Sequence, residues 1–320
     1  MKIGHAASGL KQKFAGLGRE IWKRKLAYLF IAPLIIGLLI FSYYPPVYGL
    51  TLSFFEKHSV GEMSFVGFRN YIDLFHDSVF LRSIPTMFAI MIPRLLIGIV
   101  VPLVMAELIF GVKSQKLQSL YRVLVLVPIV APGVVGTLIW RNIFDPTSGL
   151  LTTVARLLGF MGPTQVIDWL GDPNLVVPSI IFMGFPWIGG TSVLIYLSGI
   201  MNISNEVFEA ADLHGCPIMR RIFVIDIPLI MGQIRYFLIM GIINGLQDYS
   251  TQYTLTGGGP GYTTYVPGWY MYNIAFGINR RAGYAAAIGM VLFLVIMIIT
   301  LFTYRLINGS KGGMLERDCL

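Results

Sequence analysis

Charged residues are scarce in this chain. Only 12% of its 320 residues are Asp, Glu, Lys or Arg, whereas 55% are hydrophobic. An average soluble domain carries about 25% charged residues, so a water-soluble protein of this size could not cover its surface. Two cysteines are too few for a disulfide scaffold, and disorder requires low hydrophobicity and high charge. The composition predicts an integral membrane protein whose solvent is the lipid bilayer.

Six apolar stretches are long enough to cross a bilayer, which takes about 20 helical residues. The sequence predicts an all-α protein with a cytoplasmic tail at 1–25, six spans within 26–307 and a second tail at 308–320. The spans are expected at about 26–46, 85–110, 120–140, 175–199, 228–249 and 282–304. The first of them is far longer than the apolar region of a signal peptide, so we expect it to remain as an anchor.

Basic residues set the expected orientation. Six spans place both termini on one side, and fifteen of the 24 Lys and Arg residues fall on that side, against seven on the other. Because cytoplasmic loops are enriched in Lys and Arg, both termini are predicted to be cytoplasmic. The same rule accounts for the net charge of +8, so no nucleic-acid partner is expected.

One segment outside the spans is also expected to be helical. In residues 68–75 the side chains of Phe68, Tyr71, Ile72 and Phe75 fall on one helical face. This pattern predicts a short amphipathic helix that lies at the external membrane interface.

The loop at 200–227 is acidic, although its side of the membrane is expected to be basic. Ser204 is a candidate N-cap, with Glu206 in the favoured first turn. Gly215 is a helix stop, and Pro217 can begin a second helix that ends before the next proline. The pattern predicts two short helices joined at Gly215. Such a hairpin is either a docking knob for another protein or a plain interfacial loop, and the local pattern leaves both open.

In this loop Glu209, Ala210 and Ala211 are followed by Gly215 and then by Ile225-Asp226-Ile227-Pro228. This pattern resembles the EAA motif of the permease subunits of bacterial ABC importers, with Ile227 where the family pattern has Leu. The flanks resemble the carbohydrate branch, related to the maltose-transporter permeases. They comprise Trp187-Ile188-Gly189-Gly190, Leu194-Ile195-Tyr196-Leu197, Thr256-Gly257-Gly258-Gly259-Pro260-Gly261 and Gly283-Tyr284-Ala285-Ala286-Ala287. The resemblance covers about Leu26 to Leu306.

The resemblance implies the transmembrane permease of an importer for a saccharide, meaning a sugar, oligosaccharide or related polyol. The implied partners are a second, similar permease, two ATP-binding-cassette ATPase subunits and an extracytoplasmic solute-binding protein, at the bacterial inner membrane. The hairpin would dock in a cleft of the ATPase. Glu209 can accept charge-assisted hydrogen bonds from a basic groove, Ala210 and Ala211 allow close approach, and Gly215 permits the turn.

No cofactor, metal or catalytic residue is expected in this chain. It has no G-x-x-x-x-G-K-[ST] phosphate loop, so ATP must bind to another subunit. Its four histidines share no metal-ligand spacing. An ion-coupled secondary transporter remains the alternative, but it would need paired intramembrane charges on broken helices, commonly within inverted repeats, and no repeat is evident. An intramembrane enzyme would need several catalytic side chains that converge within the spans, and no such set is apparent in the sequence.

The fifth span carries the candidate substrate pathway. Gly241, Gly245 and Asp248 recur at steps of four and three, so they share one helical face. Asn244 lies next to that face. The face either binds sugar hydroxyls or packs against another helix, and the use of the corresponding stripe by the related maltose permease favours binding. Trp187 of the fourth span could stack on a sugar ring or anchor the chain at the interface.

Three further ionisable residues fall within expected spans, where charge is costly: Arg94, Glu107 and Arg235. Glu107 and Arg235 lie near the cytoplasmic ends of their spans and are expected to reach the interface or to pair with each other. Arg94 lies deeper, and it either lines a pathway or braces a neighbouring helix.

Overall fold

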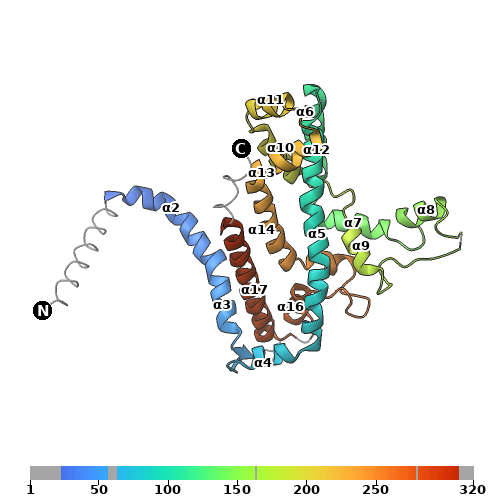
Figure 1. Ribbon diagram of the computed structural model, residues 1–320. Coiled ribbons are helices and arrows are strands. Elements are labelled where there is room, and N and C mark those ends of the chain that lie inside the picture. Colours follow the sequence, from blue (N-terminus) through green and yellow to red (C-terminus); the bar gives the residue numbers. More distant parts are fainter. Residues whose placement is uncertain (1–22, 57–62, 163, 279, 310–320) are drawn as a thin grey trace.

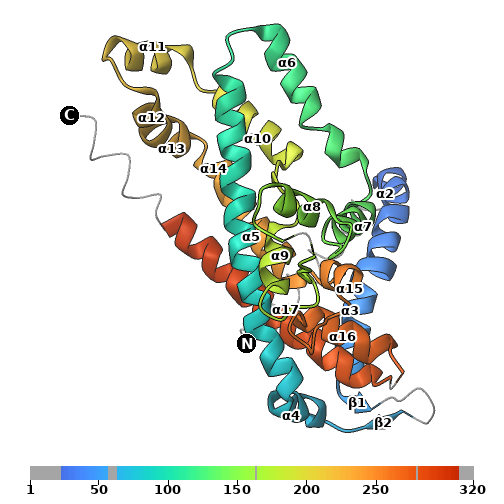
Figure 2. The ribbon, with the colours of Figure 1, turned by 90° about the vertical axis from the view of Figure 1, so that its right-hand side faces the viewer.

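The computed structural model describes residues 23–56, 63–162, 164–278 and 280–309. These residues are overwhelmingly helical. The strands among them are two short ones, β1 (Phe55–Glu56) and β2 (Ser64–Phe65), which pair antiparallel. The longest helix, α5 (Ser78–Phe110), runs through the molecule beside α14 (Met231–Gln247) and α17 (Ala282–Gly309) (Figures 1 and 2). The predicted all-α membrane fold is confirmed.

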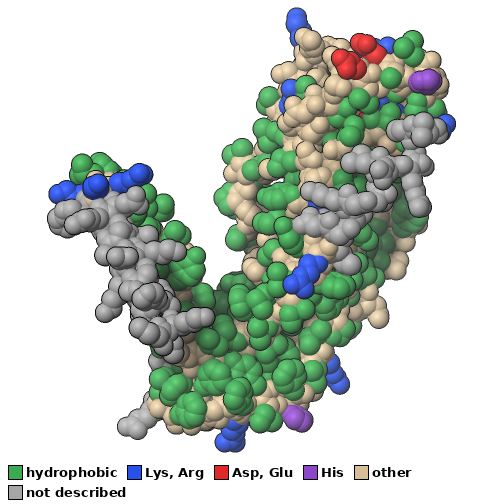
Figure 3. Space-filling view, turned by 60° about the vertical axis from the view of Figure 1, so that its left-hand side comes forward, with side chains coloured by type: hydrophobic (Ala, Val, Ile, Leu, Met, Phe, Trp, Pro, Cys, Tyr) green, Lys and Arg blue, Asp and Glu red, His purple; other side chains and the backbone are tan. Residues whose placement is uncertain are grey.

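By length and composition, three helical runs in the described part of the chain could each cross a membrane: Lys25–Leu52, α5 and the part of α17 up to Arg305. The first run consists of α2 (Lys25–Leu38), the π-helix η1 (Leu39–Tyr43) and α3 (Tyr44–Leu52). It continues past the expected end at position 46 because Pro45 and Pro46 fall at the first positions of α3, where a helix tolerates proline. Helix α3 packs against α17, whereas α2 diverges from the body and leaves an open hollow beside it (Figures 1 and 3).

Two expected spans are bent instead of continuous. The helix expected at 120–140 is divided into α6 (Gln115–Leu124) with the 3-10 helix η2 (Val127–Val130), and then α7 (Gly133–Ile143), which meet at 87°. The bend follows from Pro132, because a proline disfavours helical backbone in the residue before it, and Ala131 is extended with ψ of 129°. The second bent run joins residues 218–229 to α14 at 71°, with Ile230 at the break.

The helix expected at 175–199 is interrupted. The structure has α9 (Val176–Phe182) and α10 (Gly190–Met201), separated by an irregular segment at 183–189. In that segment Gly184 has φ of +98°, which a residue with a side chain rarely adopts. Trp187 lies in this segment and also has a positive φ, of +56°.

The acidic loop forms the predicted pair of helices at one end of the molecule (Figure 1). Helix α11 (Asn205–Leu213) follows Ser204, whose side chain makes no capping hydrogen bond among the described residues. Gly215 then adopts φ of +63°, as expected for a helix stop. The second run consists of α12 (Ile218–Arg221), the π-helix η3 (Ile222–Asp226) and α13 (Ile227–Leu229). It passes Pro228, contrary to the expected end, because the π-turn places this proline in the first turn of α13.

The opposite end holds the strands, α4 (Arg69–His76) and α16 (Pro267–Phe276), whereas α8 (Leu150–Leu157) projects sideways beside α7 (Figure 1). Helix α15 (Ser250–Leu255) follows α14 along the chain. Helix α4 is the predicted amphipathic helix, and Phe68, Ile72 and Phe75 are exposed along it. The largest buried cluster joins α5, α9, α14 and α16 through Met87, Ile180, Leu246 and Trp269. This packing fixes α14 against α5.

Candidate functional site

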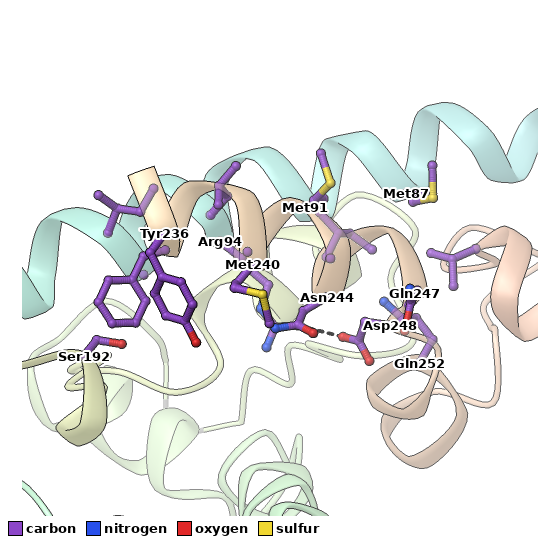
Figure 4. Close-up of a pocket in the computed structure, with 18 residues that line it drawn as sticks. Met87, Met91, Arg94, Ser192, Tyr236, Met240, Asn244, Gln247, Asp248 and Gln252 are labelled. Carbon is purple, nitrogen blue, oxygen red and sulfur yellow. Dashed lines mark hydrogen bonds and ion pairs between the residues drawn. The ribbon is translucent and has the colours of Figure 1, made fainter. Parts of the chain in front are cut away.

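A cavity of about 600 Å³ lies against α5 and α14, with one residue from α10 and one from α15 in its wall. This volume is within the range of small-molecule sites. Its wall is largely apolar, formed by side chains such as Met87, Met91 and Met240 (Figure 4). The polar side chains in the wall are Arg94, Ser192, Tyr236, Asn244, Gln247, Asp248 and Gln252.

Adjacent faces of α14 make different contacts: one packs against α5, and the other lines the cavity. A side-chain carbon added to Gly241 would collide with Leu95, and one added to Gly245 would collide with Met91, so both glycines are the close contact with α5. Asn244 is exposed and lies on the part of α14 that faces the cavity. The glycines therefore permit tight packing of α14 on α5, and the side-chain amide of Asn244 is available to a ligand in the cavity.

Asp248 lies in the cavity wall as the C-cap residue of α14. Its φ of −68° is still helical, whereas its ψ of 119° turns the chain that follows away from the helix axis. Gly241, Gly245 and Asp248 all line the cavity, in agreement with the predicted common face. Its carboxylate accepts hydrogen bonds from Nη1 of Arg94 at 3.3 Å, from Oγ1 of Thr251 at 2.9 Å and from Oγ of Ser250 at 3.2 Å.

The hairpin residues lie at the end of the molecule where α5 terminates, away from the cavity (Figures 1 and 2). Glu209 and Ala210 are exposed on α11, whereas Ala211 is buried against the body. Glu209, Glu206 and Asp212 make the outer surface of α11 acidic, and acidic side chains gather at this end in Figure 3. Exposed apolar side chains, among them Leu213 and Ile218, flank the turn.

The chain matches the family described as "Binding-protein-dependent transport system inner membrane component" over residues 78–311. It belongs to this family. The protein is thus the membrane-spanning permease of an ATP-binding-cassette importer, and ATP hydrolysis is carried out by a separate subunit.

Two kinds of known protein resemble the permease along most of its length. The arabinooligosaccharides transport system permease protein AraP of Bacillus subtilis is 28% identical over 293 residues, covering 91% of each chain. A bacterial ABC transporter that imports the acidic polysaccharide alginate has a chain with a TM-score of 0.80 at 24% identity, over 92% of this chain and 99% of that one. The alginate transporter in complex with a pentasaccharide-bound periplasmic protein gives a TM-score of 0.76 at 25% identity, over 89% and 94%.

Of the five residues predicted for the pathway, the permease brings four together. Gly241, Asn244, Gly245 and Asp248 all lie in the cavity wall, whereas Trp187 is not among the residues described there. The Trp187 ring instead packs edge-on against Phe182 and Phe185, at 5.8 and 5.0 Å between ring centroids.

Three other polar residues of the wall were not predicted from the sequence: Ser192, Tyr236 and Gln252. Gln252 is 1% exposed, and its Oε1 has no hydrogen-bond partner in the described part of the chain. No helical periodicity links it to α14, because the chain changes direction between them. A polar side chain in an otherwise apolar helix, such as Tyr236, was the available signal.

Of the three further intramembrane charges, Arg94 and Glu107 form ion pairs, whereas Arg235 forms none among the described residues. Arg94 lines the cavity and also braces the segment after α14 through Asp248. Glu107 forms an ion pair with Arg221 of α12 at 3.7 Å, and not with Arg235 as one expectation had it. The pairing with α12 depends on the bend at Ile230, which turns the second hairpin helix back towards α5.

Proposed function

We propose that the permease translocates a saccharide along the cavity between α5 and α14. The carrying observation is the wall itself: amide and hydroxyl groups of Asn244, Gln247, Gln252, Ser192 and Tyr236 lie among apolar side chains. Sugars present hydroxyl groups at their edges and C–H groups on their faces, which such a mixed wall can match. The import of arabinooligosaccharides and of alginate by similar proteins supports this substrate class.

The charges in the cavity favour an uncharged saccharide. Arg94 and Asp248 are the two charged side chains among the described residues of the wall, and they pair with each other. An acidic sugar would have to compete with Asp248 for the guanidinium of Arg94. A neutral sugar can accept or donate hydrogen bonds at the edge of the pair without separating it.

The proposed assembly contains a second, homologous permease, two ATPase subunits and an extracytoplasmic solute-binding protein. Both termini and the α11–α12 hairpin lie on the cytoplasmic side. There the exposed Glu209 and Ala210 contact an ATPase, while Ala211 packs inside the hairpin and Gly215 shapes its turn. The arm Lys25–Leu52, whose apolar window has none of its residues buried, is available to lipid and to the second permease. In this assembly the partner permease would cover the cavity and complete the pathway.

The test measures uptake into proteoliposomes that contain the whole complex. The solutes would be a neutral oligosaccharide, arabinotriose, and an acidic one, a triuronate, each presented on the cognate binding protein. We expect uptake of the neutral solute, and its loss in Asn244→Leu at unchanged complex yield. Ile243→Ala, one position away on α14 and outside the cavity wall, is the matched control. Uptake that is unaffected by Asn244→Leu would place the pathway elsewhere.

A further inference from the structure

One guanidinium, that of Arg221, ties together three elements at the hairpin end of the permease. Its Nε donates to Oδ2 of Asp226 in η3 at 3.0 Å, and its Nη2 lies 3.7 Å from Oε2 of Glu107 in α5. Its Cζ also lies 5.3 Å from the ring centroid of Phe208 in α11 and 5.5 Å from that of Phe110 in α5. The side chain therefore contacts the first hairpin helix, the second hairpin run and the long helix at once.

The environment of this guanidinium is buried and short of positive charge. The side chains of Asp226 and Glu107 are 0% and 7% exposed, and that of Arg221 is 19% exposed. Oδ1 of Asp226 and both carboxylate oxygens of Glu107 have no hydrogen-bond partner among the described residues. Two buried carboxylates thus depend on one cation, and an ion buried without its partner is strongly destabilising. Separating Arg221 from these two carboxylates would therefore strongly destabilise the fold.

Helix α5 connects the ion pair at Glu107 to the cavity. Glu107 and Arg94 lie on the single helix α5, thirteen residues apart, which corresponds to roughly 20 Å along a helix. Arg94 reaches Asp248 in the cavity wall. A displacement of the hairpin that carries Arg221 with it must therefore move the end of α5, or else separate the buried charges.

We infer that Arg221 is a positioning residue that makes the α11–α12 hairpin and the end of α5 move as one body, so that motion at the ATPase contact reaches the cavity. This inference rests on the proposed docking of the hairpin on an ATPase. It assigns a role to Glu107, Asp226 and Arg221 beyond stabilising the fold. The rings of Phe208 and Phe110, tilted to each other with centroids 5.3 Å apart, fill the space beside the guanidinium of Arg221.

Glu107→Leu tests the inference, because it cuts the tie to α5 and leaves Arg221 and Asp226 as a balanced pair. Spin labels would be placed at Asp212 of α11 and Leu108 of α5, both exposed, in a complex whose native Cys216 and Cys319 are replaced by Ser. In the otherwise native complex we expect the same inter-label distance without nucleotide and with ATP. In Glu107→Leu we expect that distance to change on ATP binding, and coupled uptake to fall at least tenfold at unchanged complex yield.

Val104→Ala, an exposed position one turn earlier on α5, is the matched control and should behave as the native complex does. Arg221→Met leaves two buried carboxylates unpaired and is expected to lower the yield. Adding Glu107→Leu and Asp226→Leu to it should restore the yield but not the fixed distance. A fixed distance in Glu107→Leu, or a distance that already changes in the native complex, would overturn the inference. A native complex with the fixed distance but no saccharide uptake would contradict the proposed function instead.

Discussion

The guanidinium of Arg94 lies 3.3 Å from the carboxylate of Asp248, although 154 positions separate the two residues in the chain. The contact joins α5 to the segment that follows α14, at the wall of the cavity. It stabilises two charges at membrane depth, where an unpaired charge would cost several kcal/mol. It also fixes the one place in the wall where charge could select between substrates.

Asp248→Asn keeps the shape of the side chain and part of its hydrogen bonding, so it should alter the affinity of transport and spare assembly. It also frees Arg94, and we expect relative uptake of the triuronate over arabinotriose to rise. Asp248→Leu should abolish uptake with the ATPase still bound. The measurement is uptake of both solutes beside complex yield, with Arg94→Met/Asp248→Leu as the charge-balanced control. Native uptake kinetics in Asp248→Leu would show that this part of the wall is not the pathway.

Gly245→Leu should act on packing before it acts on transport. The new side chain would enter the space that Met91 occupies, and overpacking of this kind costs about 1–3 kcal/mol. We expect a lower complex yield and a lower temperature of thermal unfolding in detergent. Asn244→Ala, on the neighbouring cavity face, should leave both unchanged and reduce uptake. If the two variants exchanged these effects, the assignment of the faces of α14 would be reversed.

Two changes in the hairpin should uncouple the permease from its ATPase. Glu209→Lys reverses an exposed charge on α11, and Gly215→Val introduces a β-branched residue at φ of +63°, which costs roughly 1–2 kcal/mol. Both variants should insert normally but lose ATPase on co-purification, together with solute uptake. Glu209→Gln, which keeps hydrogen-bonding capacity, should be milder. Normal assembly and transport in Glu209→Lys and Gly215→Val would exclude the hairpin as the coupling element.

Asp77 makes the stability of the opposite end sensitive to acid. Burial raises the pKa of Asp77, but hydrogen bonds from the hydroxyls of Tyr270 and Tyr284 and from the amides of Phe80 and Val79 outweigh it and lower the pKa below 3.8. A lowered pKa in the folded state means that the carboxylate contributes stability above pH 3.8. That contribution is lost as the pH falls through the folded-state pKa.

The measurement is thermal unfolding of the detergent-purified permease from pH 7 to pH 3, compared with that of Asp77→Asn. Asn caps a helix about as well as Asp, so we expect the variant to lose about 1 kcal/mol at neutral pH through weaker hydrogen bonds from the hydroxyls of Tyr270 and Tyr284. The difference between the two proteins should shrink towards pH 3. A difference that stays constant over this range would show that the charge of Asp77 does not stabilise the fold.

Much of the architecture follows from local sequence patterns. The scarcity of charge, the long apolar runs and the acidic loop around Gly215 are properties of neighbouring residues, so the membrane class and the pair of hairpin helices could be read from them. The motif at Glu209–Gly215 also led to the family. The bends were not predicted at this level: Pro132 lies at one of them, but the bend angle depends on how the two helices pack against their neighbours.

The sequence alone determined the class of protein, the helices and the residues that would serve as candidates, because helix formation and bilayer insertion depend on runs of adjacent side chains. Only the tertiary structure decided which candidates meet. Asp248 at the end of α14 pairs with Arg94, Gly241 and Gly245 contact α5 while Asn244 faces the cavity, and Glu107 pairs with Arg221. These contacts join residues far apart in the chain, and the packing of α5 against its neighbours, which no local pattern encodes, brings them together.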